Sequence, residues 1–127
     1  CPACMRAFFS FNSTEDSSNK VMAPLTTLDE IYLSEDAMRK VLVMKMDIEG
    51  HEGLALLGAA RFLSEAPPCY LKVELERTWL RASGTPFEDV LLFLDSKGFD
   101  TRRFRKTDCC EFFFHQKDMR ACLMSKA

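Results

Sequence analysis

The residues of this chain with the clearest chemical potential form a short acidic segment after an apolar run. Asp47 and Glu49 stand two positions apart, Gly50 follows, and His51 and Glu52 come next. Two carboxylates with this spacing at the end of a strand can point the same way, and could hold a metal ion or a substrate hydroxyl between them. The ordinary pKa of histidine is near neutrality, so His51 could act as a general base.

Each of these residues also has a purely structural interpretation. Acidic residues just before a helix often cap its free N–H groups, which contributes roughly 1 kcal/mol, and the pattern alone favours this role for Asp47 and Glu49. A histidine in the first turn of a helix is more often a capping or surface residue. Lys45 favours a functional role for its neighbour Asp47, because a lysine on a central strand is costly to bury unless it is paired.

A second set of polar residues follows the next apolar run. Glu76 and Trp79 could contact a substrate, and Glu74 could join the acidic segment from the neighbouring strand. Alternatively, Glu74 and Glu76 face solvent on a sheet edge, and Trp79 packs against the following helix. The order of the strands decides between these interpretations.

Hydrophobic periodicity predicts the elements that position these residues. Capping-box spacing marks two helix starts, Thr27-Leu-Asp-Glu30 and Thr85-Pro-Phe-Glu88. The order strand, helix, strand, helix, strand, strand predicts a mostly parallel sheet with an antiparallel final strand, which is half of a doubly wound α/β fold. In such sheets ligands bind at the carboxyl ends of the strands, where both polar sets lie. The expected strands are residues 41–48, 69–76, 99–105 and 111–116, and the expected long helices are residues 51–65 and 85–98.

Composition restricts the possible classes of protein. The 127 residues, 47% hydrophobic and 28% charged, predict one soluble globular domain. A net charge of -2 gives no field that would hold nucleic acid, and no apolar stretch approaches the roughly 20 residues of a membrane-spanning helix. The six cysteines are not spaced like a secreted disulfide framework, which predicts reduced thiols and favours an intracellular location. Cys1 and Cys4 lack the second pair that a zinc site requires, so no metal site is expected.

Three segments together resemble the FkbM family of S-adenosylmethionine-dependent methyltransferases: Thr27-Leu-Asp-Glu30, Met44 to Glu52, and Leu56-Leu-Gly-Ala59. The resemblance implies a Rossmann-like methyltransferase fold. It also implies methyl transfer from S-adenosylmethionine to a hydroxyl of a sugar or other small metabolite. On this basis residues 1–24 are expected to be a loop or a truncated N-terminal end, residues 25–116 a partial FkbM-like domain, and residues 117–127 a C-terminal tail.

The resemblance also implies roles for single residues. Asp47 would lie where the methyl donor and acceptor meet, and Asp47 or His51 would remove the hydroxyl proton. The expected catalytic residues are therefore Asp47 and His51, the expected cofactor-binding residues are Asp47, Glu49 and Gly50, and the expected substrate-binding residues are Glu52, Glu76 and Trp79.

One departure from the family pattern changes the prediction. Enzymes of this fold hold the cofactor on a glycine-rich loop, whereas the five glycines here, at positions 50, 53, 58, 84 and 98, form no such cluster. We therefore expect the C-terminal half of a methyltransferase domain, inactive by itself and with an unpaired sheet edge. A non-catalytic binding or scaffold module with the same fold is the alternative. A carboxylate-metal hydrolase using Asp47, Glu49 and Glu76 is a third hypothesis.

Overall fold

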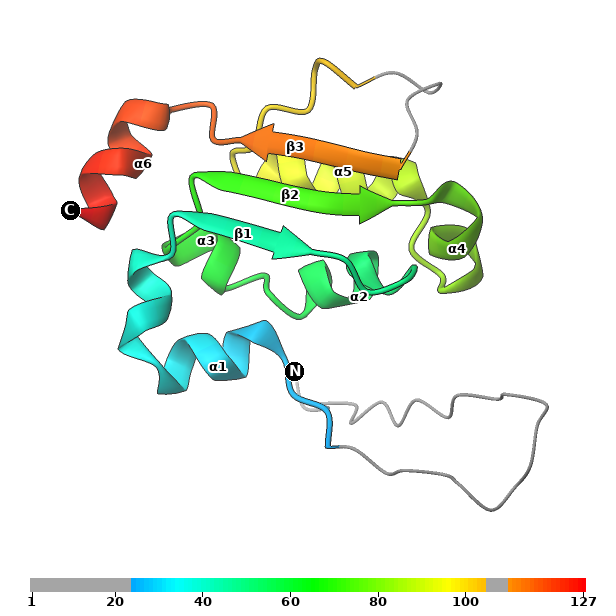
Figure 1. Ribbon diagram of the computed structural model, residues 1–127, viewed down its shortest axis with the longest axis horizontal. Coiled ribbons are helices and arrows are strands. Elements are labelled where there is room, and N and C mark those ends of the chain that lie inside the picture. Colours follow the sequence, from blue (N-terminus) through cyan, green and yellow to red (C-terminus); the bar gives the residue numbers. More distant parts are fainter. Residues whose placement is uncertain (1–23, 105–109) are drawn as a thin grey trace.

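A computed structural model describes residues 24–104 and 110–127 of the chain (Figure 1). Helices and strands alternate through most of this part. The elements are α1 (Leu28–Ser34), the 3-10 helix η1 (Asp36–Lys40), β1 (Val43–Met46), α2 (Glu52–Leu57), α3 (Phe62–Glu65), β2 (Tyr70–Leu75), α4 (Arg77–Ala82), α5 (Phe87–Ser96), β3 (Cys110–His115) and α6 (Met119–Lys126).

The three strands form one mixed sheet in the order β1-β2-β3. β1 and β2 are parallel, with Met46 beside Val73, and β3 runs antiparallel to β2, with Phe112 on the other side of Val73. This confirms the expected parallel pair with an antiparallel final strand, and it is consistent with part of a methyltransferase fold. Within the described residues β2 is the central strand, and the expected unpaired sheet edge lies at β1.

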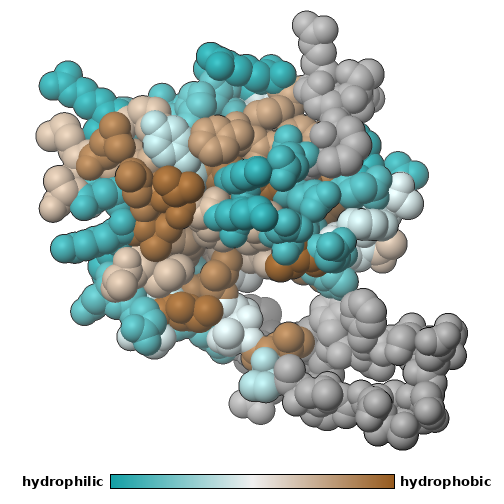
Figure 2. All heavy atoms as spheres, viewed as in Figure 1, coloured by the Kyte–Doolittle hydropathy of each residue, from teal (hydrophilic) through white to brown (hydrophobic). Residues whose placement is uncertain are grey.

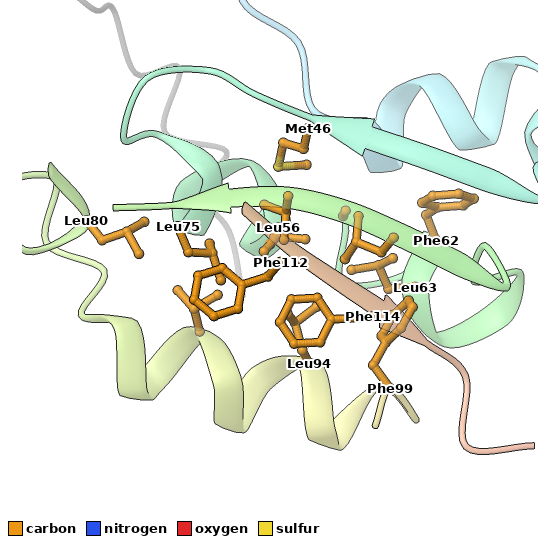
Figure 3. Packing of buried hydrophobic residues seen from close by; sticks show 14 of the residues in the cluster. Met46, Leu56, Phe62, Leu63, Leu75, Leu80, Leu94, Phe99, Phe112 and Phe114 are labelled. Atoms are coloured by element: carbon orange, nitrogen blue, oxygen red, sulfur yellow. The ribbon is translucent and has the colours of Figure 1, made fainter. Parts of the chain in front are cut away.

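One face of the sheet carries the hydrophobic core. Leu71, Val73 and Leu75 alternate along β2 and are almost completely buried, as the two-residue period of a strand requires. Helices α2, α3 and α5 cover this face, and Figure 3 shows Leu56 of α2 and Leu94 of α5 pointing toward it. Figure 1 shows α3 and α5 passing behind the strands. The opposite face has no helical layer in the described structure.

The helix expected over residues 51–65 is two helices, α2 and α3, separated by a turn that begins at Gly58. The carbonyl of Gly58 accepts a hydrogen bond from the backbone N–H of Asp29 in α1 at 2.9 Å. The Asp29 carboxylate in turn accepts hydrogen bonds from the backbone N–H groups of Arg61 and Phe62, at 3.0 and 2.8 Å. A contact with a distant helix therefore ends α2 and starts α3.

Helix α5 begins later than its capping motif predicts. Pro86, not Thr85, is its N-cap, and no side chain caps it. The Thr85 hydroxyl is buried instead beside Ser83, 3.1 Å from that side chain's oxygen, and Glu88 pairs with Arg77 at 3.1 Å. Both side chains of the expected capping box thus have other partners. The expected strand 99–105 is also wrong for residues 99–104, where only Phe99 forms a bridge, to Gln116, before a turn.

The C-terminal residues form helix α6 where a tail was expected. A disulfide bond joins Cys122 of this helix to Cys69 at the start of β2. The expectation of reduced thiols is therefore wrong for this pair, because α6 brings Cys122 beside a strand that lies 53 residues earlier. Cys1, Cys4 and Cys109 lie outside the described residues. None of the helices in the described part of the chain has the length and apolar character needed to cross a bilayer.

Candidate functional site

The acidic segment forms a tight turn between β1 and α2. Glu49 and Gly50 both adopt positive φ angles, of 55° and 92°. The side chain of Glu52, only 1% exposed, folds back under this turn, and its Oε1 accepts a hydrogen bond from the backbone N–H of Ile48 at 2.8 Å. The buried Glu52 side chain therefore stabilises the conformation of the turn.

The turn packs directly against the start of α4. A Cβ atom added to Gly50 would lie 2.5 Å from the Cβ of Trp79, which explains why this buried position is a glycine. Glu76 is the N-cap of α4 and accepts a hydrogen bond from the backbone N–H of Trp79 at 2.8 Å. The backbone N–H groups of Trp79 and Thr78 hold the pKa of the Glu76 carboxyl below its ordinary value. The two predicted polar sets thus meet at the carboxyl ends of β1 and β2, with Trp79 45% exposed.

Asp47 does not cap α2. The N-cap of that helix is His51, which makes no side-chain capping hydrogen bond. Instead the Nζ of Lys45 donates a hydrogen bond to the Asp47 carboxylate at 2.9 Å. This bond holds the pKa of Asp47 below its ordinary value and that of Lys45 above it. Lys45 is paired, as its position predicts, but it is exposed because no helix of the described structure covers its face of the sheet.

Glu74 lies beside Asp47 on the neighbouring strand. Because Met46 pairs with Val73 in parallel strands, residues 47 and 74 come next to each other on the same side of the sheet. A hydrogen bond with Asp47 is the main cause that raises the pKa of Glu74, and partial burial and the charges of Glu49 and Glu52 add to it. Glu74 was considered as a member of the acidic group but was not predicted as a site residue, because its place depends on strand order.

No helix of the described residues covers the face that carries these side chains. Figure 2 views the same side as Figure 1 and shows hydrophilic side chains gathered over the middle of the sheet. The side chains of Lys45 and Asp47 are 60% and 38% exposed. A polar ligand therefore has open access to the carboxylates.

His51 is half-buried at the first turn of α2. It directly follows the turn that Glu49 and Gly50 form, four residues after Asp47 in the sequence.

The described residues contain no group of three or more His, Cys, Asp or Glu side chains arranged to hold a metal ion. This gives the carboxylate-metal hydrolase no geometric support, because Glu76 caps α4 and does not join Asp47 and Glu49.

A separate cavity of about 220 Å³ lies between α2 and α5. Its walls are mostly apolar and include Leu56, Val90 and Phe93. Gly53 and Thr85 also line it, and a Cβ on Gly53 would lie 2.2 Å from the Thr85 hydroxyl oxygen, so α2 and the loop before α5 approach closely there. The cavity contains none of the predicted site residues.

Comparison with known proteins identifies one match. Residues 6–101, well over half of the chain, match the family model described as the methyltransferase FkbM domain. Searches of curated proteins and of solved structures gave no match.

Proposed function

Since the chain belongs to the FkbM methyltransferase domain family, we propose that it is part of an S-adenosylmethionine-dependent enzyme that methylates a hydroxyl group of a sugar or other small metabolite. The observation that carries this proposal is the junction of the acidic turn with Trp79 at the carboxyl ends of β1 and β2. This is the edge of an α/β sheet at which ligands bind.

The charge of the site suits the cofactor. S-adenosylmethionine carries a cationic sulfonium and an ammonium group, and it supplies the methyl group when bound. The exposed carboxylates of Asp47 and Glu49 would hold these cationic groups or the ribose hydroxyls. Gly50 contributes to cofactor binding only indirectly in this proposal. Its positive φ allows the tight turn that leaves the Glu49 side chain exposed.

Asp47 is the proposed acceptor of the hydroxyl proton. Its pKa lies below the ordinary value, so it is ionised at neutral pH and can accept a hydrogen bond from the acceptor hydroxyl. That bond orients the hydroxyl oxygen. When the oxygen is methylated, the hydroxyl proton passes to the Asp47 carboxylate. His51 is the second candidate for this role.

Trp79 is the proposed wall for the acceptor molecule. Its indole is 45% exposed beside the turn, and a large aromatic face suits the apolar side of a sugar ring. Glu76 fixes the start of α4, and Glu52 fixes the turn. Glu76 and Glu52 were expected to bind the substrate. In this proposal Glu76 instead positions Trp79, and Glu52 positions Asp47.

We also propose that the glycine-rich cofactor loop comes from sequence outside this chain, because the glycines here do not form one. The same observation favours the alternative, a non-catalytic module that keeps the fold.

The test is an assay with methyl-labelled S-adenosylmethionine and a panel of sugars, using the longest protein that the gene encodes. A labelled methyl ether supports the enzyme. Binding of the sugars without any labelled product supports the non-catalytic module and contradicts the enzyme.

A further inference from the structure

Three carboxylates form a row across the uncovered face of the sheet. Asp47 follows β1, Glu74 lies beside it in β2, and Glu111 pairs with Glu74 from β3. Successive strands in a sheet are about 4.8 Å apart, so neighbouring negative charges in such a row repel each other.

Lysines form ion pairs with the two outer members of this row. Lys45 pairs with Asp47 at 2.9 Å, and Lys72 pairs with Glu111 at 3.0 Å. Among the ion pairs of the described residues, none includes Glu74. Its partner is the Asp47 carboxylate, which is also negative. A proton between Asp47 and Glu74 would remove this repulsion, as it does in other close carboxylate pairs.

A second observation is a buried carboxylate oxygen without a hydrogen-bond donor. The Oε2 of Glu52 is buried and has no partner within the described structure. A buried carboxylate oxygen without a donor is unfavourable. Its negative charge also acts on Glu74 and favours the protonated form of that carboxyl group.

We propose that Glu74 is a positioning residue for Asp47, and that the two carboxylates together receive and share the proton that the acceptor hydroxyl loses. This inference rests on the proposed methyltransferase function. The hydroxyl oxygen forms a bond to the transferred methyl carbon while the carbon–sulfur bond breaks, and that bond's electron pair stays on sulfur. The hydroxyl O–H bond breaks, and its proton passes to Asp47 and from there to Glu74, which then donates a hydrogen bond to the Asp47 carboxylate.

The groups that face Glu74 determine how the pair depends on pH. Asp47, Glu49 and Glu52 favour its protonated form, and Glu111 lies opposite it on β3. The positive charges of Lys45 on β1 and of Lys72 on its own strand favour the charged form. The pair takes up its first proton at the raised pKa of Glu74. Methyl transfer should therefore decline as the pH falls through that value, because the pair is then already protonated.

The first experiment follows the carboxyl carbons of Asp47 and Glu74 by NMR during a pH titration of the chain. We expect the signals of both carboxyl carbons to change in the same two titration steps. We expect Asp47→Asn to lower the pH at the midpoint of the Glu74 titration. Glu88→Gln, on α5 and paired with Arg77, is the control and should leave that midpoint unchanged. If Glu74 titrates at the ordinary glutamate pKa and Asp47→Asn does not move it, the inference is wrong.

The second experiment measures methyl transfer against pH. Glu74→Gln should lower kcat about 10-fold, leave the KM for the acceptor within about twofold, and move the acid limb to lower pH. Glu74→Asp, which keeps a carboxyl group, should recover part of kcat. An active protein whose pH profile is unchanged in Glu74→Gln contradicts this inference alone. A protein that transfers no methyl group under any condition contradicts the proposed function, and the role of the pair with it.

Discussion

The carboxylate of Asp29 in α1 accepts a hydrogen bond from the backbone N–H of Phe62, 33 residues further along the chain, at 2.8 Å. It also accepts one from the N–H of Arg61. Thr27, two residues earlier, caps α1 through a complete capping box with Glu30. The Thr-Leu-Asp segment that resembles the family motif is therefore structural here, because it caps two helices and joins them.

Replacing Asp29 should destabilise the fold without touching the site. We expect Asp29→Ala to lower the free energy of unfolding by about 1–2 kcal/mol, since the start of α3 loses both of its hydrogen bonds. Urea denaturation measures this change. Asp36→Ala, at a fully exposed position, is the control and should stay within about 0.5 kcal/mol of the parent protein. Equal effects of the two variants would contradict the capping role.

Gly50 should tolerate no side chain, for two separable reasons. Its φ of 92° is strained for other residues, and a Cβ there would meet the Cβ of Trp79 at 2.5 Å. Gly84 has a similar φ of 81° but nothing within 4 Å of an added Cβ. We expect Gly84→Ala to cost about 1 kcal/mol and Gly50→Ala about 1–3 kcal/mol more, as measured by thermal unfolding. If the two variants lose the same stability, the turn does not pack on Trp79 as described.

The disulfide bond should stabilise the fold by attaching α6. In the described part of that helix only Cys122 is buried, while Leu123 and Met124 are largely exposed. Closing a loop of this length typically contributes about 2–4 kcal/mol. We therefore expect Cys122→Ser to lower the midpoint of urea unfolding under oxidising conditions. A reductant should lower the midpoint of the parent protein to the same value and leave that of the variant unchanged. A parent protein that is insensitive to reductant would contradict this prediction.

Asp100 should make the fold sensitive to acid. Its buried carboxylate accepts hydrogen bonds from the side chain and backbone of Arg102, which hold its pKa far below the ordinary value. A group whose pKa is lowered by folding contributes stability above its unfolded pKa of about 3.9, and this contribution is lost as the pH falls toward the folded pKa. Asp100→Asn should therefore lower stability at pH 7 and flatten its decline below about pH 4. Parallel pH–stability curves for the two proteins would contradict this.

Local patterns predicted the three strands of the described sheet and the region of α5, but they missed α4 and α6, and long-range contacts decided where several elements end. The alternation of Leu71, Val73 and Leu75 was enough to predict β2, because burial follows the strand period directly. The turn that begins at Gly58 could not be predicted, because it depends on Asp29 in another helix. The pairing of Cys69 with Cys122 depends in the same way on where α6 lies.

Prediction of the site from the sequence was limited in the same way, by contacts between distant residues. The motif around Asp47 and Gly50 was visible in the sequence, and its position at the carboxyl end of a strand is confirmed. Glu74 could be selected only once β2 was known to lie next to β1, because residue 74 then stands beside residue 47. Glu76 has the same spacing from Glu74 as Glu49 has from Asp47, yet it caps a helix that the sequence did not indicate.

The most direct test of this account is kcat/KM for methyl transfer by Asp47→Asn, with Asp36→Asn as the matched control. Asp47 is exposed and caps no helix, so the variant should fold as the parent protein does, with an unchanged circular dichroism spectrum. We expect Asp47→Asn to lose at least about 100-fold in kcat/KM and the control to lose none. A folded Asp47→Asn protein whose kcat/KM stays within about twofold of the parent would contradict the central role of Asp47.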